Sequence, residues 1–278
     1  MKNLVLFFKG FILGVANIIP GVSGGTLAIT LGIYEDIIKA ISHFFSNFKK
    51  NIKFLLPIAL GAVVSILLLS KVISFSLEKA PVATTLFFIG LIVGGLPLIF
   101  KKIEGKKVKK SYIISFIVPM VIVLGLTFIS SGNNYINLTN FNPLMILILF
   151  IVGVVASATM IIPGISGSFV LMLLGFYKPI VKTVSNLTNL NMFGHNMLVL
   201  IPVGIGVLVG IVLIAKLIEY LLKKHETSTY YAIIGFIISS IASLIIGLFA
   251  YKLNVVELLV GVLMFMIGSL IGYKLGDK

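Results

Sequence analysis

The sequence IIPGVSG at residues 18–24 returns almost unchanged as IIPGISG at residues 161–167, and these two stretches decide the fold. Each lies within a longer apolar segment, residues 4–45 and residues 143–187. Proline lacks the backbone N–H that a helix needs, and glycine is a poor helix former, so each segment is predicted to break at its motif. Matching Pro/Gly breaks in the two halves of a chain are typical of transporters built from inverted repeats.

The similarity between the two halves extends well beyond the motifs. Shared apolar composition would align Leu with Ile by chance, but it would not align Gly, Pro, Tyr and Lys at a constant spacing. We therefore infer a duplication, with residues 1–135 as the first repeat and residues 136–278 as the second. The aligned pairs are Gly10 and Gly153, Gly32 and Gly175, Tyr34 and Tyr177, Lys39 and Lys182, and, after a slip of two residues, Pro57 and Pro202, Gly61 and Gly206, Lys71 and Lys216, and Gly90 and Gly235.

The composition is that of a membrane protein. Hydrophobic residues make up 59% of the chain, charged residues 11%, and the mean hydropathy is +1.20. Soluble domains carry about 25% charged residues. The chain has no Cys, so it forms neither disulfides nor thiolate metal sites. These numbers predict an all-α integral membrane protein.

Six further apolar runs are each long enough to cross the roughly 30 Å hydrocarbon core of a bilayer as a helix. The run before the first break, residues 4–18, makes only about 22 Å of helix, so segments 4–45 and 143–187 are expected to be broken, re-entrant hairpins. Each repeat then has one hairpin and three spans, and this odd number of crossings inverts the second repeat relative to the first. The six predicted spans are residues 54–76, 82–100, 111–131, 198–222, 230–250 and 254–273.

The lysines indicate how the chain is oriented. The net charge of +14 comes from 22 Lys with no Arg, and the lysines gather in connections such as residues 49–53, 101–110 and 223–224. By the positive-inside rule, these connections and both termini are expected on the cytoplasmic side of the cytoplasmic (inner) membrane. The expected partner of this charge is the anionic surface of membrane lipids, and not nucleic acid. The sequence leaves association into a homo-oligomer open.

The two breaks are the candidate binding site. Non-helical backbone at membrane depth needs polar partners, and glycine N–H groups, small hydroxyls and the start of a helix together favour an anion. We expect a phosphate to be held from both sides, although breaks of this kind also let helices pack closely. The candidate phosphate-binding residues are Lys9, Asn17, Gly21, Ser23, Gly24, Gly25, Thr26 and Tyr34 in the first repeat, and Gly164, Ser166, Gly167, Ser168 and Tyr177 in the second.

Charged residues within membrane segments are costly and need an interpretation of their own. Lys9 could neutralise an anionic head group, or it could extend to the cytoplasmic surface. Glu35 follows the first break, where it could carry a coupling proton or be an ordinary interfacial residue. Tyr34 and Tyr177 could contact a head group or serve as interfacial aromatic residues.

Neither catalysis nor metal binding is indicated. The three histidines, His43, His195 and His225, share no ligand spacing. No Ser, His and Asp arrangement is visible, and the few carboxylates do not pair within a span. We therefore expect a protein without cofactor or metal that is not an enzyme.

Three stretches resemble the signature of the PopT-type polyprenyl-phosphate transporters, formerly a family of unknown function: KG at residues 9–10, ANIIPGVSGGT at residues 16–26 and GIYE at residues 32–35. The resemblance covers essentially the whole chain, including the second motif. It implies a flippase that returns undecaprenyl phosphate from the outer to the inner leaflet, where this carrier lipid is reused for peptidoglycan and other cell-envelope polymers.

The resemblance also implies that Lys9 is the basic position of the family and Glu35 its acidic position. The absence of Arg departs from the pattern and predicts a different geometry at the head group, because Lys is a point charge and Arg is a bidentate fork.

Two other functions fit parts of the sequence. A secondary transporter of a small soluble anion would use the same inverted repeats, and a sealed cavity without a lateral opening would favour it. A membrane enzyme acting on polyprenyl diphosphate would need acid–base residues that the sequence does not bring together.

Overall fold

The structure, a computed structural model, describes residues 2–18, 22–128, 136, 138, 142–165, 167–185, 193–249, 251 and 255–276. The regular elements in these residues are α-helices, which confirms the predicted all-α class. In chain order they are α1 (Lys2–Ile18), α2 (Gly24–Thr30), α3 (Tyr34–Ser42), α4 (Phe48–Lys79), α5 (Pro81–Phe100), α6 (Lys110–Phe128), α7 (Pro143–Ile161), α8 (Gly167–Leu173), α9 (Tyr177–Ser185), α10 (Phe193–Lys224), α11 (Glu226–Leu248) and α12 (Val255–Gly276).

Within this described part of the chain, seven helices are long and apolar enough to cross a membrane: α4, α5, α6, α7, α10, α11 and α12. The protein is therefore a multi-pass membrane protein. The two predicted hairpins differ in their first helix, because α1 has 17 residues and α7 has 19 and reaches spanning length. Asn142 fixes the start of α7, since its Oδ1 accepts the N–H of Met145 at 2.7 Å and Pro143 follows it at the first helical position.

The two halves of the chain hold their helices in the same order, and three equivalent pairs have equal lengths. The short helices α2 and α8 have seven residues each, α3 and α9 have nine, and α4 and α10 have 32. The turns after α2 and α8 both contain a glycine with positive φ, Gly32 at 66° and Gly175 at 76°. Equivalent backbone hydrogen bonds close the two turns: the N–H of Ile33 donates to the carbonyl oxygen of Ala28, and the N–H of Phe176 donates to that of Leu171. These features are consistent with the inferred repeats.

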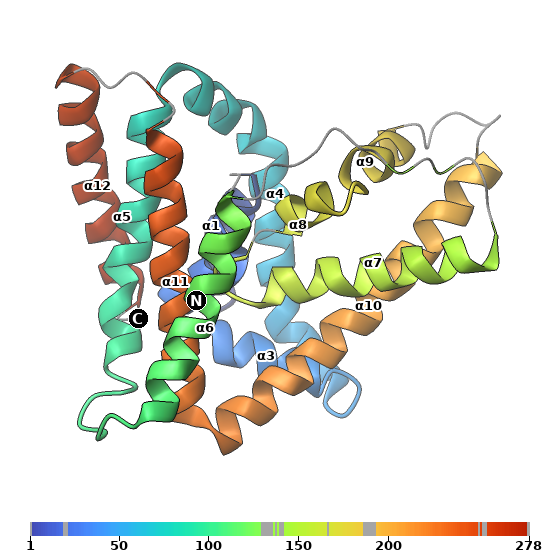
Figure 1. The fold of residues 1–278 in the computed structure, drawn as a ribbon, viewed down its shortest axis with the longest axis horizontal. Helices are drawn as coiled ribbons and strands as arrows, with labels where there is room; N and C mark the ends of the chain where they lie inside the picture. The colour runs from blue at the N-terminus through green and yellow to red at the C-terminus, as the bar shows by residue number, and fades with distance from the viewer. Residues whose placement is uncertain are drawn as a thin grey trace.

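The halves interlock through their spans. Within each half, the first helix packs on the first long span, α1 on α4 and α7 on α10 (Figure 1). Between the halves, α5 packs on α12 and α6 packs on α11. The last span of each half therefore packs against the middle span of the other half. Lys106, which follows α5, reaches Glu226 at the start of α11 with 3.1 Å between Nζ and Oε2. The end of α5 therefore lies near the beginning of its counterpart α11, which is consistent with opposite orientations of the two repeats.

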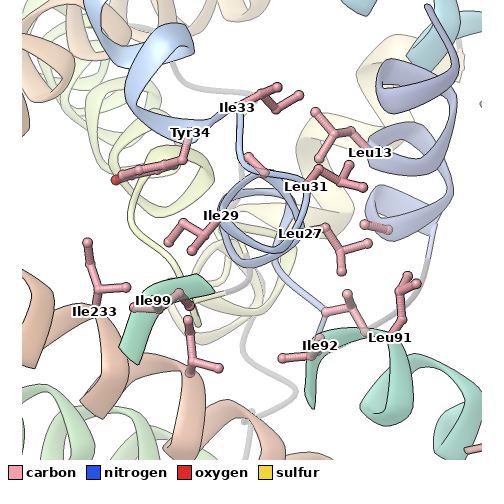
Figure 2. Close-up of a cluster of buried hydrophobic side chains, with 14 of the residues drawn as sticks. Leu13, Leu27, Ile29, Leu31, Ile33, Tyr34, Leu91, Ile92, Ile99 and Ile233 are labelled. Carbon is pink, nitrogen blue, oxygen red and sulfur yellow. The ribbon is translucent and has the colours of Figure 1, made fainter. Parts of the chain in front are cut away.

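Helix α2 is enclosed by the core. Its residues from Gly25 to Thr30 are all buried, and Leu27 and Leu31 have no exposed surface. Figure 2 shows Leu27 and Ile29 projecting from this helix among side chains of neighbouring helices, including Ile92 of α5. The break that precedes α2 and the turn that follows it are thereby held at fixed positions in the protein.

Glycines set the spacing of the paired helices, again symmetrically. A Cβ atom on Gly61 of α4 would lie 2.0 Å from the carbonyl oxygen of Phe7 in α1, and one on Gly206 of α10 would lie 2.0 Å from that of Phe150 in α7. Since both contacts are with backbone, no side chain can move aside to admit a methyl group. The helices approach this closely because small residues stand at the interface.

We expect Gly206→Ala to destabilise the protein, because the added methyl would push α10 away from α7 at a cost of about 1–3 kcal/mol. Gly204→Ala, in the same helix, is the matched control, since a Cβ there meets no other atom within 4 Å and Ala favours a helix over Gly. Thermal unfolding in detergent should show a midpoint lower by about 2 °C or more for Gly206→Ala and unchanged or higher for Gly204→Ala. Equal midpoints would contradict the packing described above.

Candidate functional site

The two broken segments contact each other directly. The N–H of Gly164 donates to Oγ1 of Thr26 at 2.9 Å. In the other direction, Ser23 Oγ donates to the carbonyl oxygen of Ile162 at 3.4 Å, and the Tyr34 hydroxyl donates to that of Ile161 at 3.2 Å. The Ser23, Thr26 and Tyr34 side chains are buried, so the first half meets the second through polar groups inside the protein.

Glycine is required on both sides of this contact. A Cβ on Gly25 would lie 2.8 Å from the carbonyl oxygen of Ile161. Gly164 has a φ of +82°, which residues with a side chain rarely adopt, and a Cβ there would lie 2.5 Å from the carbonyl oxygen of Phe236 in α11. The Pro-Gly motifs thus allow backbone to approach backbone.

Lys9 lies at the other end of α2. It is 6% exposed, and its Nζ donates to the carbonyl oxygen of Leu31 at 2.7 Å, at the turn that leads into α3. A carbonyl at the C-terminal end of a helix is a favourable partner for a cation. An ammonium has three donors, and this bond uses one of them.

A cavity of about 920 Å³ opens beside Lys9, between α1, α3, the start of α4 and the end of α10. Five lysines and two carboxylates line it, together with a His and three Asn. The charged lining residues are Lys9, Lys39, Lys50, Lys53, Lys223, Asp36 and Glu219. His43 Nδ1 lies 3.3 Å from Glu219 Oε2, so α3 of the first half is tied here to α10 of the second.

A smaller cavity of about 290 Å³ shares Gly32 and Asp36 with the larger one and surrounds Glu35. Lys102 Nζ lies 2.8 Å from Glu35 Oε1, Lys39 Nζ lies 3.6 Å from Oε2, and the hydroxyl of Tyr230 in α11 donates to Oε1. Burial alone would raise the pKa of Glu35. The hydrogen bonds from Lys102 and Tyr230, and the charges of Lys102 and Lys39, outweigh burial and hold this pKa below its ordinary value.

The lowered pKa gives the Glu35 contacts a predictable pH dependence. A carboxyl whose pKa is lower in the folded protein contributes stability above its unfolded pKa of about 4.3, and that stability is lost as the pH falls through the folded value. We expect Glu35→Gln to lower the unfolding temperature by a constant amount from pH 7 to about pH 5, with the difference from wild type shrinking below that. Glu78→Gln, which removes an exposed carboxylate at the end of α4, is the control; a difference that grows toward low pH would refute the assignment.

The structure brings together only part of the predicted site. Ser23, Gly25, Thr26, Tyr34 and Gly164 meet at the contact between the breaks. Lys9 and Glu35 lie instead along the two cavities. Gly24 and Gly167 begin α2 and α8, and Tyr177 begins α9 and is half-buried. Gly21 and Ser166, and the side chains of Asn17 and Ser168, lie outside the described residues.

Several residues that line the cavities were not predicted. Lys102 was interpreted only as a loop charge, and Tyr230 only as part of a span. Glu219 is buried near the end of α10, where it contacts Lys223 at 2.6 Å. A carboxylate in an otherwise apolar run was a usable signal for Glu219, since such a charge is costly without partners. Nothing in the sequence linked residues 35, 102 and 230, because only tertiary packing brings them together.

Comparison with known proteins supplies the chemical context. A family described as undecaprenyl phosphate translocase-like matches residues 13–254 of the chain. A protein of Staphylococcus aureus (strain NCTC 8325 / PS 47) named polyprenyl-phosphate transporter is 35% identical over 272 residues, covering 96% of this chain and 94% of its own. A protein of Vibrio cholerae serotype O1 (strain ATCC 39315 / El Tor Inaba N16961) with the same name is 28% identical over 258 residues, covering 87% of this chain and 77% of its own. No solved structure matches the chain.

Proposed function

The chain belongs to the undecaprenyl phosphate translocase-like family, and from this premise we propose that it transports polyprenyl phosphate. The proposed substrate is undecaprenyl phosphate, moved from the outer to the inner leaflet of the cytoplasmic membrane so that cell-envelope synthesis can reuse it. The observation that carries the proposal is the 35% identity to a named polyprenyl-phosphate transporter along 96% of the chain. The family and both relatives are named for translocation or transport, in agreement with the predicted transporter that is not an enzyme.

The phosphate head is the part of the substrate that needs the protein, because an anion is strongly disfavoured in hydrocarbon. The polyprenyl tail can stay in lipid while the head crosses. We place the head between the two breaks, where Ser23 and Tyr34 now donate their hydroxyl hydrogens to carbonyl oxygens of the second half. Phosphate oxygens are stronger acceptors than these carbonyls, so a phosphate can replace them as the two halves separate. The N–H of Gly164, now bonded to Thr26, would donate to it as well.

Movement is proposed to come from two inverted repeats, residues 1–135 and 136–278, that rock against each other about the breaks. The lysine-rich ends, with both termini, face the cytoplasm in this arrangement. Glu35 is the proposed proton-coupling group. Its carboxylate is held by Lys102 and Lys39 of its own half and accepts a hydrogen bond from Tyr230 of the second half. Movement between the halves would break the bond from Tyr230, and loss of this donor favours protonation of Glu35.

The test is reconstitution into liposomes, following how fast labelled undecaprenyl phosphate becomes protected from an external probe. Wild-type protein should accelerate this exchange, and Ser23→Ala, Gly24→Val, Ser166→Ala and Gly167→Val should reduce it. Ser115→Ala, which removes an exposed hydroxyl of α6 bonded within its own helix, should not. Absence of lipid exchange, combined with uptake of a small soluble anion, would replace the proposal by a soluble-anion transporter. Release of inorganic phosphate from polyprenyl diphosphate would instead indicate an enzyme.

A further inference from the structure

The larger cavity has no role in the function proposed so far. It lies beyond the C-terminal end of α2, where Gly32 and Ile33 line it, whereas the breaks meet at the N-terminal end of the same helix. We propose that this cavity is a second binding site for a phosphate monoester, occupied by the head of the lipid at the lysine-rich face before or after it visits the breaks. The inference rests on the proposed function and extends it.

The charge of the cavity favours an anion. Five lysines face two carboxylates in its lining. Glu219 pairs with Lys223 at 2.6 Å and with His43 at 3.3 Å, and Asp36 acts on Lys9 through its charge, so the lysines still outnumber the carboxylates. Within the described residues, Lys50 and Lys53 form no ion pair, although both line the cavity at the start of α4. Their charges are therefore available to a ligand.

Lys9 gives the site a fixed cation at its inner wall. Its burial and its bond to the Leu31 carbonyl hold the ammonium in place, with two further donors for a ligand. A buried ammonium is worth more to an anion than an exposed one, because less water screens the attraction. The lining of the cavity thus combines exposed lysines, Lys50 and Lys53, with one buried and positioned lysine, Lys9.

The shape favours a lipid head over free phosphate. A volume of about 920 Å³ exceeds what a single phosphate needs, and Val5, Leu6 and Phe54 add apolar wall between the charges. The same two helices carry exposed apolar side chains, Leu4 and Phe8 on α1 and Leu56 and Leu60 on α4, and exposed apolar surface of this kind faces lipid in a membrane protein. A phosphate in the cavity could therefore keep its isoprenoid tail along α1 and α4.

Binding of farnesyl phosphate, a short polyprenyl monophosphate, to the detergent-purified chain tests the proposal by calorimetry at low salt. Lys50→Gln combined with Lys53→Gln should weaken binding by about tenfold, given the attraction contributed by each lysine near an anionic group. Lys107→Gln combined with Lys110→Gln, two exposed lysines outside the cavity, should change it less than about twofold. Equal losses in both double variants, or no loss in either, would overturn the inference.

Two further ligands distinguish a lipid phosphate head from free inorganic phosphate as the occupant of the cavity. Farnesol, which lacks the phosphate, should not bind measurably at this site. Inorganic phosphate should compete weakly if the site is shaped for a lipid head; binding as tight as that of farnesyl phosphate, with the same loss in the Lys50 and Lys53 double variant, would assign the site to free phosphate.

Liposome exchange distinguishes failure of this inference from failure of the proposed function. The Lys50 and Lys53 double variant should transport normally at saturating undecaprenyl phosphate and slowly at low concentration. If wild-type exchange is fast and the variant matches it at all concentrations, the second site is wrong and the function stands. If wild-type protein moves no lipid, the function is wrong, whatever farnesyl phosphate does.

Discussion

Lys9→Met is expected to slow transport of polyprenyl phosphate by roughly tenfold or more, since a hydrogen bond to a charged group is worth about 1.5–3 kcal/mol. Lys9 is the one buried lysine among the described residues. Its ammonium lies at the end of α2 and faces the basic cavity, so it is placed to accompany a phosphate between the cavity and the breaks. Methionine keeps the length and flexibility of the side chain and removes its charge.

The measurement is the initial rate of lipid exchange in liposomes, read beside the thermal unfolding midpoint. Lys71→Met, at an exposed lysine of α4, is the control and should leave the rate within about twofold, because the charge of an exposed lysine is largely screened. Lys9→Gln separates charge from positioning, since an amide can still donate to the Leu31 carbonyl. If Lys9→Gln transports as fast as wild type, the positive charge is dispensable and Lys9 only holds the turn after α2.

The architecture was predictable because it is encoded in local, one-dimensional patterns. Helix α5 runs from Pro81 to Phe100 where the sequence predicted 82–100, since proline marks its start and lysines follow its end. Helix α4 is much longer than the predicted span, Phe48–Lys79 instead of 54–76. Hydropathy detects only the part of a helix that lies in lipid, and α4 continues through charged residues on both sides, Lys49, Lys50 and Lys53 before the predicted span and Glu78 and Lys79 after it. For the same reason, hydropathy does not show where a broken segment stops within the bilayer.

The site was predicted in its residue types but not in its present contacts. The hydroxyls of Ser23, Thr26 and Tyr34 were expected around a phosphate. In this conformation Ser23 and Tyr34 donate to carbonyl oxygens of the second half, and Thr26 accepts the N–H of Gly164. A sequence indicates which groups can bind an anion, but not which competing acceptor is nearer. Two partners of Glu35 were beyond prediction for a related reason: Lys102 lies in the turn after α5 and Tyr230 lies in α11, at separations where one sequence carries no information on contact.

Gly164→Ala is expected to have the largest effect on stability of any single change considered. The left-handed backbone costs a residue with a side chain about 1–2 kcal/mol, and the collision of its Cβ with the Phe236 carbonyl, at 2.5 Å, adds about 1–3 kcal/mol. Since Phe236 O belongs to the backbone of α11, relief requires the second break to move away from that helix. The bond from Gly164 N to Thr26 Oγ1 would then lengthen or be lost.

Thermal unfolding of Gly164→Ala should therefore show a fall of several degrees, against no loss for Gly204→Ala. Gly164→Asn separates the two causes. Asparagine tolerates positive φ better than alanine but carries the same Cβ, so equal losses indicate collision with α11 and a milder loss indicates backbone strain.

Thr26→Val, which leaves the N–H of Gly164 without its acceptor at a cost of about 1–3 kcal/mol, probes the same contact from the first half. If the two broken segments act as one unit, Gly164→Ala combined with Thr26→Val should lose less than the sum of the single changes, because the first removes the contact on which the second depends. Additive losses would mean that the Gly164–Thr26 bond survives the movement of the break, and that the two halves are joined less tightly here than the structure indicates.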